Sequence, residues 1–423
     1  MTRFLSLLLC FSLFFTLNVA PQAQGQTAPA STPPIAKSLA TNLAPQVPPR
    51  AIAYQRTHYL LSFGQLGGKL LGLWLLLFTG LSLRMRRFVY RCLRLPTPTP
   101  ASIPPLRALV VYFLLLNLLF FLWLLPFGLA GFGVEHHYGF SQQSLAGFLG
   151  DSLLHVLFGM ITLPLWLGGY WLISRSPKHW WQWLWLLLIP LLLLQFVLQP
   201  VLIAPAYNKF TPLTAGPLRD HILALAKQAG ITEGKVFVED TSRRTKHVNA
   251  YVTGVGPTTR IVLNDTALQT LPEDQILAMM GHEMGHYVEG HLWVQFFAGV
   301  FGAGVFLWLA AYTLPKIVSR WKKQYPDITG ITDLAMLPAM SLVISLFLLA
   351  QSPIESGISR TLEHRADAFG LRVTHLNEAT ARLFISFAER DFSDPDPPVL
   401  LQFWFGSHPT LKERIAFAHS YQD

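Results

Sequence analysis

Long uninterrupted runs of apolar residues dominate the chain. A run needs about 17 to 25 such residues to cross the hydrocarbon core of a bilayer. Candidates lie near residues 66–83, 108–130, 150–173, 181–203, 291–314 and 333–353, and a further run over residues 4–20 follows Arg3. The pattern predicts a mainly α-helical protein with about six to seven spans, whose surroundings are a lipid bilayer.

Polar stretches between the runs divide the chain into regions. Residues 1–26 are typical of a signal peptide or first membrane anchor. A Pro/Ala/Gln-rich composition makes the next segment flexible. We expect a flexible segment in 27–52, membrane spans in 53–203, a polar region in 204–290, two further spans in 291–353 and a second polar region in 354–423. The two polar regions must supply any aqueous chemistry, as one small α+β unit.

The composition supports a membrane protein and excludes several other classes. Hydrophobic residues make up 52% of the chain and charged residues 13%, which is too apolar for a soluble enzyme of this length. The net charge of +9 comes from short basic clusters beside apolar runs, so nucleic acid is not an expected partner. Only Cys10 and Cys92 occur, so neither a disulfide framework nor a thiolate metal site is expected.

The basic clusters also predict an orientation. The clusters at 84–107, 175–178 and 316–323 fall on one side if every run spans the bilayer. By the positive-inside rule that side is cytoplasmic, so both polar regions lie on the exoplasmic face. We therefore expect a multi-pass protein of a bacterial inner membrane, although a single re-entrant segment would reverse its orientation.

The first polar region contains the motif Gly-His-Glu-Met-Gly-His at residues 281–286. Thr270 and Glu273 predict a capping box that starts a helix before it. On this helix His282 and His286 are four residues apart and project from one face, so both imidazoles can meet one metal ion.

Glu283 lies roughly 100° around the helix from the first histidine, which places it beside the ion. A carboxylate there can take a proton from a water that the metal activates and pass it to a leaving amine. The motif alone arises by chance in roughly one chain per hundred of this size. A third ligand is therefore needed to support the metal site.

An acidic pair in the second polar region supplies this ligand. Glu363 and Asp367 are four residues apart on what the pattern predicts to be a helix continuing from the last span. Glu363 would complete a His, His, carboxylate site that holds one zinc ion per chain and leaves a fourth position open. Asp367 would lie behind the ligands and orient an imidazole. The alternative is a solvated face paired with Arg360 or Arg365.

With these motifs the chain resembles the type I CAAX prenyl proteases, which are integral-membrane zinc metallopeptidases with seven spans. The resemblance extends over roughly residues 53–420. Further matching segments are 135–143, 203–213, 247–251, 260–266, 359–367 and 407–414. The resemblance implies that Glu363 is the third zinc ligand and that Asp367 is an acid often assigned as proton donor. It also implies that the two polar regions are catalytic and zincin-like.

The resemblance further implies how substrate binds. Asn249 and Ala250 would lie on an edge strand that pairs with the substrate backbone. The residues themselves predict short strands at 236–238 and 260–263, on either side of that segment.

Two residues near the C-terminus correspond to family residues beside the active site. There His408 and Arg414 could stabilise a developing oxyanion, or could instead be a helix cap and a surface charge. The remaining histidines of interest lack a partner at ligand spacing or fall off the ligand face, so we expect them to be structural: His136, His137, His247, His291 and His364.

Together these observations predict a membrane-embedded zinc metalloendopeptidase related to CAAX prenyl proteases. A signal-like N-terminus stands in place of the family's first span. We therefore carry over the family's catalytic class but not its substrate. We expect lipid-modified, membrane-anchored or misfolded polypeptides as substrates. The alternatives are a membrane quality-control metallopeptidase and, from a different class, a transporter or scaffold that breaks no bond. The sequence leaves the oligomeric state open.

Overall fold

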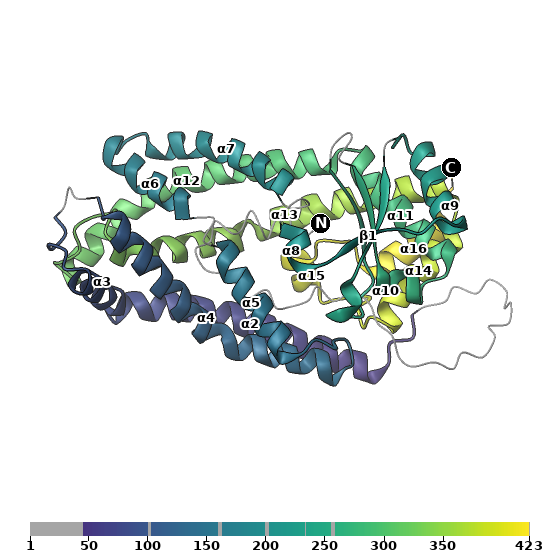
Figure 1. Cartoon of the computed structure of the whole chain (residues 1–423), viewed down its shortest axis with the longest axis horizontal. Coiled ribbons are helices and arrows are strands. Elements are labelled where there is room, and N and C mark those ends of the chain that lie inside the picture. Colours follow the sequence, from purple (N-terminus) through teal and green to yellow (C-terminus); the bar gives the residue numbers. More distant parts are fainter. Residues whose placement is uncertain are drawn as a thin grey trace.

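A computed structural model describes residues 45–99, 103–159, 163–198, 203–232, 234–254 and 259–422. The expected signal peptide or anchor at 1–26, and most of the flexible segment at 27–52, lie outside these residues. Long helices run along the longest axis of the molecule, and a small sheet with shorter helices forms one end (Figure 1). This arrangement confirms the expected fold class of a multi-span helical protein with a small α+β region.

Five helical segments of the described chain are long and apolar enough to cross a membrane. They are α2 (Pro49–Phe78), α4 (Leu106–His137), the segment made of α5 (Leu145–Gly159) and α6 (Leu163–Arg175), α12 (His291–Gln324), and α13 (Leu337–Thr374) with the 3₁₀ turn before it. A shorter apolar helix, α7 (Trp180–Leu198), packs against α12. Many large apolar side chains on these helices are exposed, as expected for surfaces that face lipid.

The end of the helical bundle opposite the sheet is held by a buried ion pair. Helix α3 (Leu81–Cys92) lies there (Figure 1). Its Arg86 is buried and pairs with Asp333, which immediately precedes the 3₁₀ turn Leu334–Met336 and then α13. Asp333 also accepts a hydrogen bond from the backbone N–H of Ala335 at 2.9 Å. Both charges are therefore satisfied without water.

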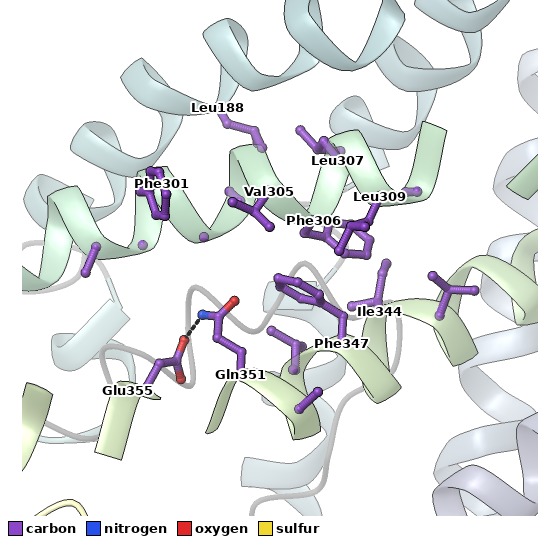
Figure 2. Close-up of a pocket in the computed structure, with 18 of the residues that line it drawn as sticks. Leu188, Phe301, Val305, Phe306, Leu307, Leu309, Ile344, Phe347, Gln351 and Glu355 are labelled. Carbon is purple, nitrogen blue, oxygen red and sulfur yellow. Dashed lines mark hydrogen bonds between the residues drawn. The ribbon is translucent and has the colours of Figure 1, made fainter. Parts of the chain in front are cut away.

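An apolar cavity of about 960 Å³ lies among α6, α7, α12 and α13. Its walls are mainly Leu, Val, Ile and Phe side chains (Figure 2). Polar residues also line it, among them Gln351, which donates a hydrogen bond to Glu355 one turn further along α13. The lining extends to Ser407 and His408, so the cavity reaches from the membrane helices to the C-terminal region.

The sheet at the other end has four described strands in the order β1-β2-β4-β3. They are β1 (Phe210–Pro212), β2 (Lys235–Glu239), β3 (Ala250–Thr253) and β4 (Arg260–Asn264). The central pair β2 and β4 is parallel, and the outer strands are antiparallel to their neighbours. The short strands expected at 236–238 and 260–263 are thereby confirmed. Strand β3 lies at an edge.

Short helices surround this end of the molecule. They are α8 (Ala204–Tyr207), α9 (Pro217–Gln228), α10 (Asp265–Thr270), α11 (Glu273–Val288), α14 (Asn377–Glu389), α15 (Val399–Phe405) and α16 (Leu411–Ser420), with a 3₁₀ turn at Thr241–Arg243. Of these, α9, α10, α11 and α14 share one core with the sheet. Buried side chains of α9, β4 and α11 meet in the core, among them Ile222, Ile261 and Met280. Burying each such side chain stabilises the fold by about 1.5–3 kcal/mol.

The expected capping box before α11 is wrong. Thr270 ends the separate helix α10, and its hydroxyl donates to the carbonyl of Thr266 at 2.7 Å. The residue that caps α11 is Pro272, which has no side-chain hydrogen bond to offer. A complete capping box instead starts α16, between Thr410 and Glu413.

Helices α11 and α13 approach so closely that a side chain would be crowded at three glycines. A Cβ atom on Gly281 would lie 3.3 Å from the backbone of Gly370, and one on Gly285 would lie 3.2 Å from that of Ala366. In the other direction, a Cβ on Gly370 would lie 2.8 Å from the backbone nitrogen of His282. The two backbones are therefore in direct contact.

We predict that Gly370→Ala lowers the free energy of unfolding by about 1–3 kcal/mol, because the new methyl group must push two backbones apart. The matched control is Gly357→Ala on the same helix, where the nearest atom to a new Cβ is an Arg360 side-chain nitrogen at 3.7 Å, an ordinary van der Waals distance. This control should be neutral or slightly stabilising. Thermal unfolding of the purified protein in detergent measures both, and equal behaviour of the two variants would contradict the close contact.

Candidate metal centre

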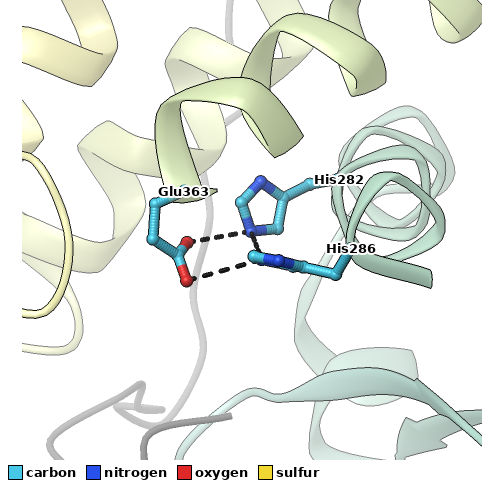
Figure 3. A group of neighbouring side chains, drawn as sticks. All are labelled: His282, His286 and Glu363. Atoms are coloured by element: carbon cyan, nitrogen blue, oxygen red, sulfur yellow. Dashed lines mark hydrogen bonds and ion pairs between the residues drawn. The ribbon is translucent and has the colours of Figure 1, made fainter. Parts of the chain in front are cut away.

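Three side chains from two helices converge at the contact between α11 and α13 (Figure 3). The Nε2 atoms of His282 and His286 lie 3.1 Å apart. The carboxylate of Glu363 lies 3.2 Å from His282 Nε2 through Oε2 and 3.4 Å from His286 Nε2 through Oε1. The three potential ligand atoms all lie within 4.8 Å of one another. The expected His, His, carboxylate group is therefore brought together.

The chemistry of this group fits a zinc ion. Glu363 is only 2% exposed, and its Oε2 atom makes no hydrogen bond with any described residue. A buried carboxylate oxygen without a hydrogen bond is costly unless a cation satisfies it. Two imidazole nitrogens and one carboxylate are a donor set that zinc prefers, with room for a fourth ligand.

The second ring nitrogen of His282 is held by an acid. Its Nδ1 lies 2.8 Å from Asp367 Oδ1. Both oxygens of this buried carboxylate also accept hydrogen bonds from Arg414 in α16, at 2.6 and 2.8 Å. Burial would lower the pKa of Arg414, but the Asp367 carboxylate raises it above its usual value, so the guanidinium stays charged. The position of Asp367 behind a ligand agrees with the interpretation drawn from helix spacing.

The second ring nitrogen of His286 contacts His291, a residue expected from the sequence to be structural. Its Nδ1 lies 2.9 Å from the Nδ1 of His291, which is fully buried. The other nitrogen of His291 lies 3.1 Å from Glu289, and Arg365 pairs with the same Glu289 oxygen at 2.8 Å. His291 does fall off the ligand face of α11. Gly290, with φ of 65°, ends that helix and turns His291 back toward His286.

Glu283 lies beside the cluster and outside it. Its Oε1 atom is 4.0 Å from His282 Nε2, and its side chain is 18% exposed. Its carboxylate therefore lies at the margin of the group. This is the position expected for the residue that follows His282 on a helix.

His408 and Arg414 both lie near the cluster and approach Glu363 Oε2, at 3.3 and 4.0 Å. His408 precedes α16, and its Nε2 lies 3.3 Å from Glu363 Oε2 while its Nδ1 lies 2.9 Å from the Ser407 hydroxyl. Its side chain is 32% exposed and lines the apolar cavity. Arg414 is instead buried against Phe384, at 4.2 Å from the ring centre.

The expected substrate strand lies next to α11, which carries His282 and His286. Ala250 is the first residue of β3, and Asn249 directly precedes it and accepts a hydrogen bond from the N–H of Asn264 at 3.0 Å. Strand β3 packs against α11. Among the strands that the structure describes, β3 pairs only with β4, so its outer edge has no strand partner.

The other histidines make structural contacts. Both ring nitrogens of His136 bond to carbonyl oxygens, and the ring of His364 packs on Phe417. His137 packs on Tyr138. The exception is His247, whose Nε2 approaches a buried carboxylate on α4.

Comparisons with known proteins agree with this geometry. Residues 212–422 match the family model described as peptidase family M48, and residues 26–209 match one described as CAAX prenyl protease N-terminal, five membrane helices. The solved crystal structure of S. mikatae Ste24p superposes with a TM-score of 0.73 over 87% of each chain, at 24% identity, which shows a shared fold.

Two curated relatives are also similar in sequence. The chain is 38% identical to the uncharacterized metalloprotease YhfN of Bacillus subtilis, over 73% of this chain and 72% of the relative. It is 31% identical to the CAAX prenyl protease 1 homolog of Arabidopsis thaliana, over 69% and 68%. The chain belongs to peptidase family M48 and is a multi-pass membrane metalloprotease related to the CAAX prenyl proteases.

Proposed function

We propose that this membrane metalloprotease binds one zinc ion per chain through His282, His286 and Glu363, and cleaves polypeptides that the membrane already holds. The convergence of these three side chains around the unsatisfied Glu363 Oε2 carries the proposal. A single site with one open position is the usual arrangement of a catalytic zinc.

Glu283 supplies the proton transfer in this proposal. A zinc ion held by His282, His286 and Glu363 would polarise the substrate carbonyl and the attacking water. The Glu283 carboxylate accepts a proton from the attacking water and later donates it to the leaving nitrogen. It is suited to this role because it is partly exposed at the margin of the ligands.

Asp367 acts in this proposal by orienting His282. Both of its oxygens are engaged by Arg414, and Oδ1 also contacts the imidazole, which leaves no free oxygen to donate a proton to substrate. Arg414 in turn holds Asp367. His408, between Glu363 and the cavity, is the residue better placed to hydrogen-bond the substrate carbonyl oxygen as charge develops on it.

The substrate binds along β3 in this proposal, with its backbone adding to the outer edge at Asn249 and Ala250. The apolar cavity, which ends at His408, suits a neighbouring lipid-modified or apolar segment of the same polypeptide. Relatives named CAAX prenyl protease support lipid-modified substrates. A quality-control role would use the same site on misfolded membrane proteins.

The catalytic end faces the exoplasmic side of a bacterial inner membrane in this proposal. The Arg-rich helix α3 lies at the end of the bundle opposite the sheet (Figure 1), and cationic loops are retained on the cytoplasmic side.

We predict that Glu283→Gln lowers kcat by about 10²–10⁴-fold, because an amide cannot accept the proton, while zinc content is unchanged. The control is Glu273→Gln, which removes an exposed carboxylate from the first turn of the same helix. Peptide-cleavage profiling on membrane-anchored substrates, with and without a chelator, measures both. Cleavage retained by both the Glu283 variant and the chelated protein would disprove the proposed mechanism.

We predict that His291→Ala lowers zinc affinity by about 10–100-fold, because His286 loses the group that orients its ring. Competition with a chromogenic chelator gives the affinity. His364→Ala, which removes a histidine outside the ligand contacts, serves as the control and should bind zinc like the wild type. Equal affinities of the wild type and both variants would show that His291 is not coupled to the metal.

We predict that Cys92, exposed at the end of α3, reacts with a membrane-impermeant maleimide only after permeabilisation. The measurement uses spheroplasts and a Cys10→Ser chain, so that Cys92 is the sole thiol. A second chain, with both cysteines replaced and Lys412→Cys introduced at an exposed position of α16, should react in intact spheroplasts. The reverse pattern would place the catalytic end in the cytoplasm.

A further inference from the structure

A second buried cluster of ionisable groups lies outside the metal centre. Glu135, in the last turn of α4, is 4% exposed. Its Oε1 atom accepts a hydrogen bond from the Tyr54 hydroxyl at 2.8 Å and lies 2.9 Å from His58 Nε2, both on α2. Its Oε2 atom lies 3.4 Å from the Nε2 of His247, which belongs to the catalytic region. One carboxylate thus joins two membrane helices to the segment before β3.

The segment that contains His247 is held from two sides. On the membrane side, the His247 ring stacks on Phe140 with centres 4.9 Å apart, and the N–H of Lys246 donates to the Phe140 carbonyl at 2.9 Å. On the sheet side, the Thr266 hydroxyl donates to the His247 carbonyl at 2.8 Å. The chain reaches Asn249 two residues later, so the start of β3 has little freedom to move.

Neither ring nitrogen of His247 makes a well-formed hydrogen bond to a described residue, and the side chain is 4% exposed. The charge of Glu135 is therefore the principal polar feature that this imidazole meets. Buried ionisable groups in such contact are sensitive to removal of either partner. No step proposed for peptide hydrolysis uses either residue.

We propose that Glu135 is a positioning residue for substrate binding. Through His247 it fixes the start of β3, and thereby the distance between the outer edge of this strand and the metal ligands on α11. The inference rests on the proposed function, because it takes β3 as the strand that binds the substrate backbone. A misplaced strand would weaken substrate binding and leave the metal ligands and Glu283 where they are.

The test compares the kinetics of Glu135→Gln with those of the wild type. The probe is an internally quenched peptide with an apolar segment, selected on the full-length wild-type protein in detergent. We expect KM to rise about tenfold, with kcat within about twofold and zinc content unchanged. The single variant His247→Gln is measured as well. The double variant Glu135→Gln/His247→Gln should raise KM no further than the single variant with the larger effect, because both residues act through one contact.

The matched control is Asp333→Asn, which removes the buried carboxylate paired with Arg86 at the far end of the bundle. It should lower thermal stability and leave KM unchanged. If Glu135→Gln fails to fold, Tyr54→Phe removes only one hydrogen bond to the same carboxylate and is expected to raise KM in the same direction. A KM unchanged in the Glu135 and Tyr54 variants, or changed as much by Asp333→Asn, would overturn the inference.

Hydrogen exchange separates this inference from the proposed function. Glu135→Gln should speed amide exchange across residues 247–253 and leave α11 unaffected, whereas Asp333→Asn should change neither. If the wild type cleaves no peptide, the proposed function fails. Exchange then still decides whether Glu135 anchors β3, and unchanged exchange at 247–253 would refute the anchoring directly.

Discussion

The whole site depends on direct backbone contact between α11 and α13. The two helices run antiparallel there, with Gly281 against Gly370 and Gly285 against Ala366. The glycines allow this separation, because a Cβ would be crowded against the facing backbone at all three and would force the helices apart at Gly370. The contact brings Glu363 level with the two histidines of α11, although the three residues come from regions separated by a long apolar helix. Because the three candidate ligand atoms must stay within 4.8 Å of one another, the cluster tolerates little change in the distance between α11 and α13.

Charged and polar partners behind both imidazoles hold the geometry of the cluster, and those behind His282 are buried. Behind one imidazole, Asp367 is neutralised by the buried Arg414. Behind the other, His291 leads to Glu289 and its partner Arg365. Each charge therefore has an opposite charge or a hydrogen bond, which is what burial of ionised groups requires. The imidazole rings keep their orientation because both nitrogens are engaged, one toward the ligand cluster and one toward these partners.

The membrane helices contribute to the site as well as anchoring it. Helix α13 is long and apolar enough to cross the membrane and continues without interruption to Glu363, so one member of the cluster is carried on a membrane helix. The apolar cavity beside α13 ends at His408, next to the cluster. On the other side, Glu135 at the end of α4 meets the catalytic region at His247. The catalytic region and the membrane helices are thus one packed structure.

The sequence by itself determined the helical membrane class, the catalytic motif and the face shared by His282 and His286, because these depend on hydrophobic run length and helix periodicity. It also singled out Glu363, through its spacing from Asp367 and a family resemblance. Only the tertiary structure decided that His291 returns to His286, since a turn at positive φ redirects the chain in a way that periodicity does not encode. The capping box expected before α11 failed for a related reason, because a separate short helix takes up Thr270. Contacts between distant segments depend on how the helices pack, and local patterns in the sequence do not determine that packing.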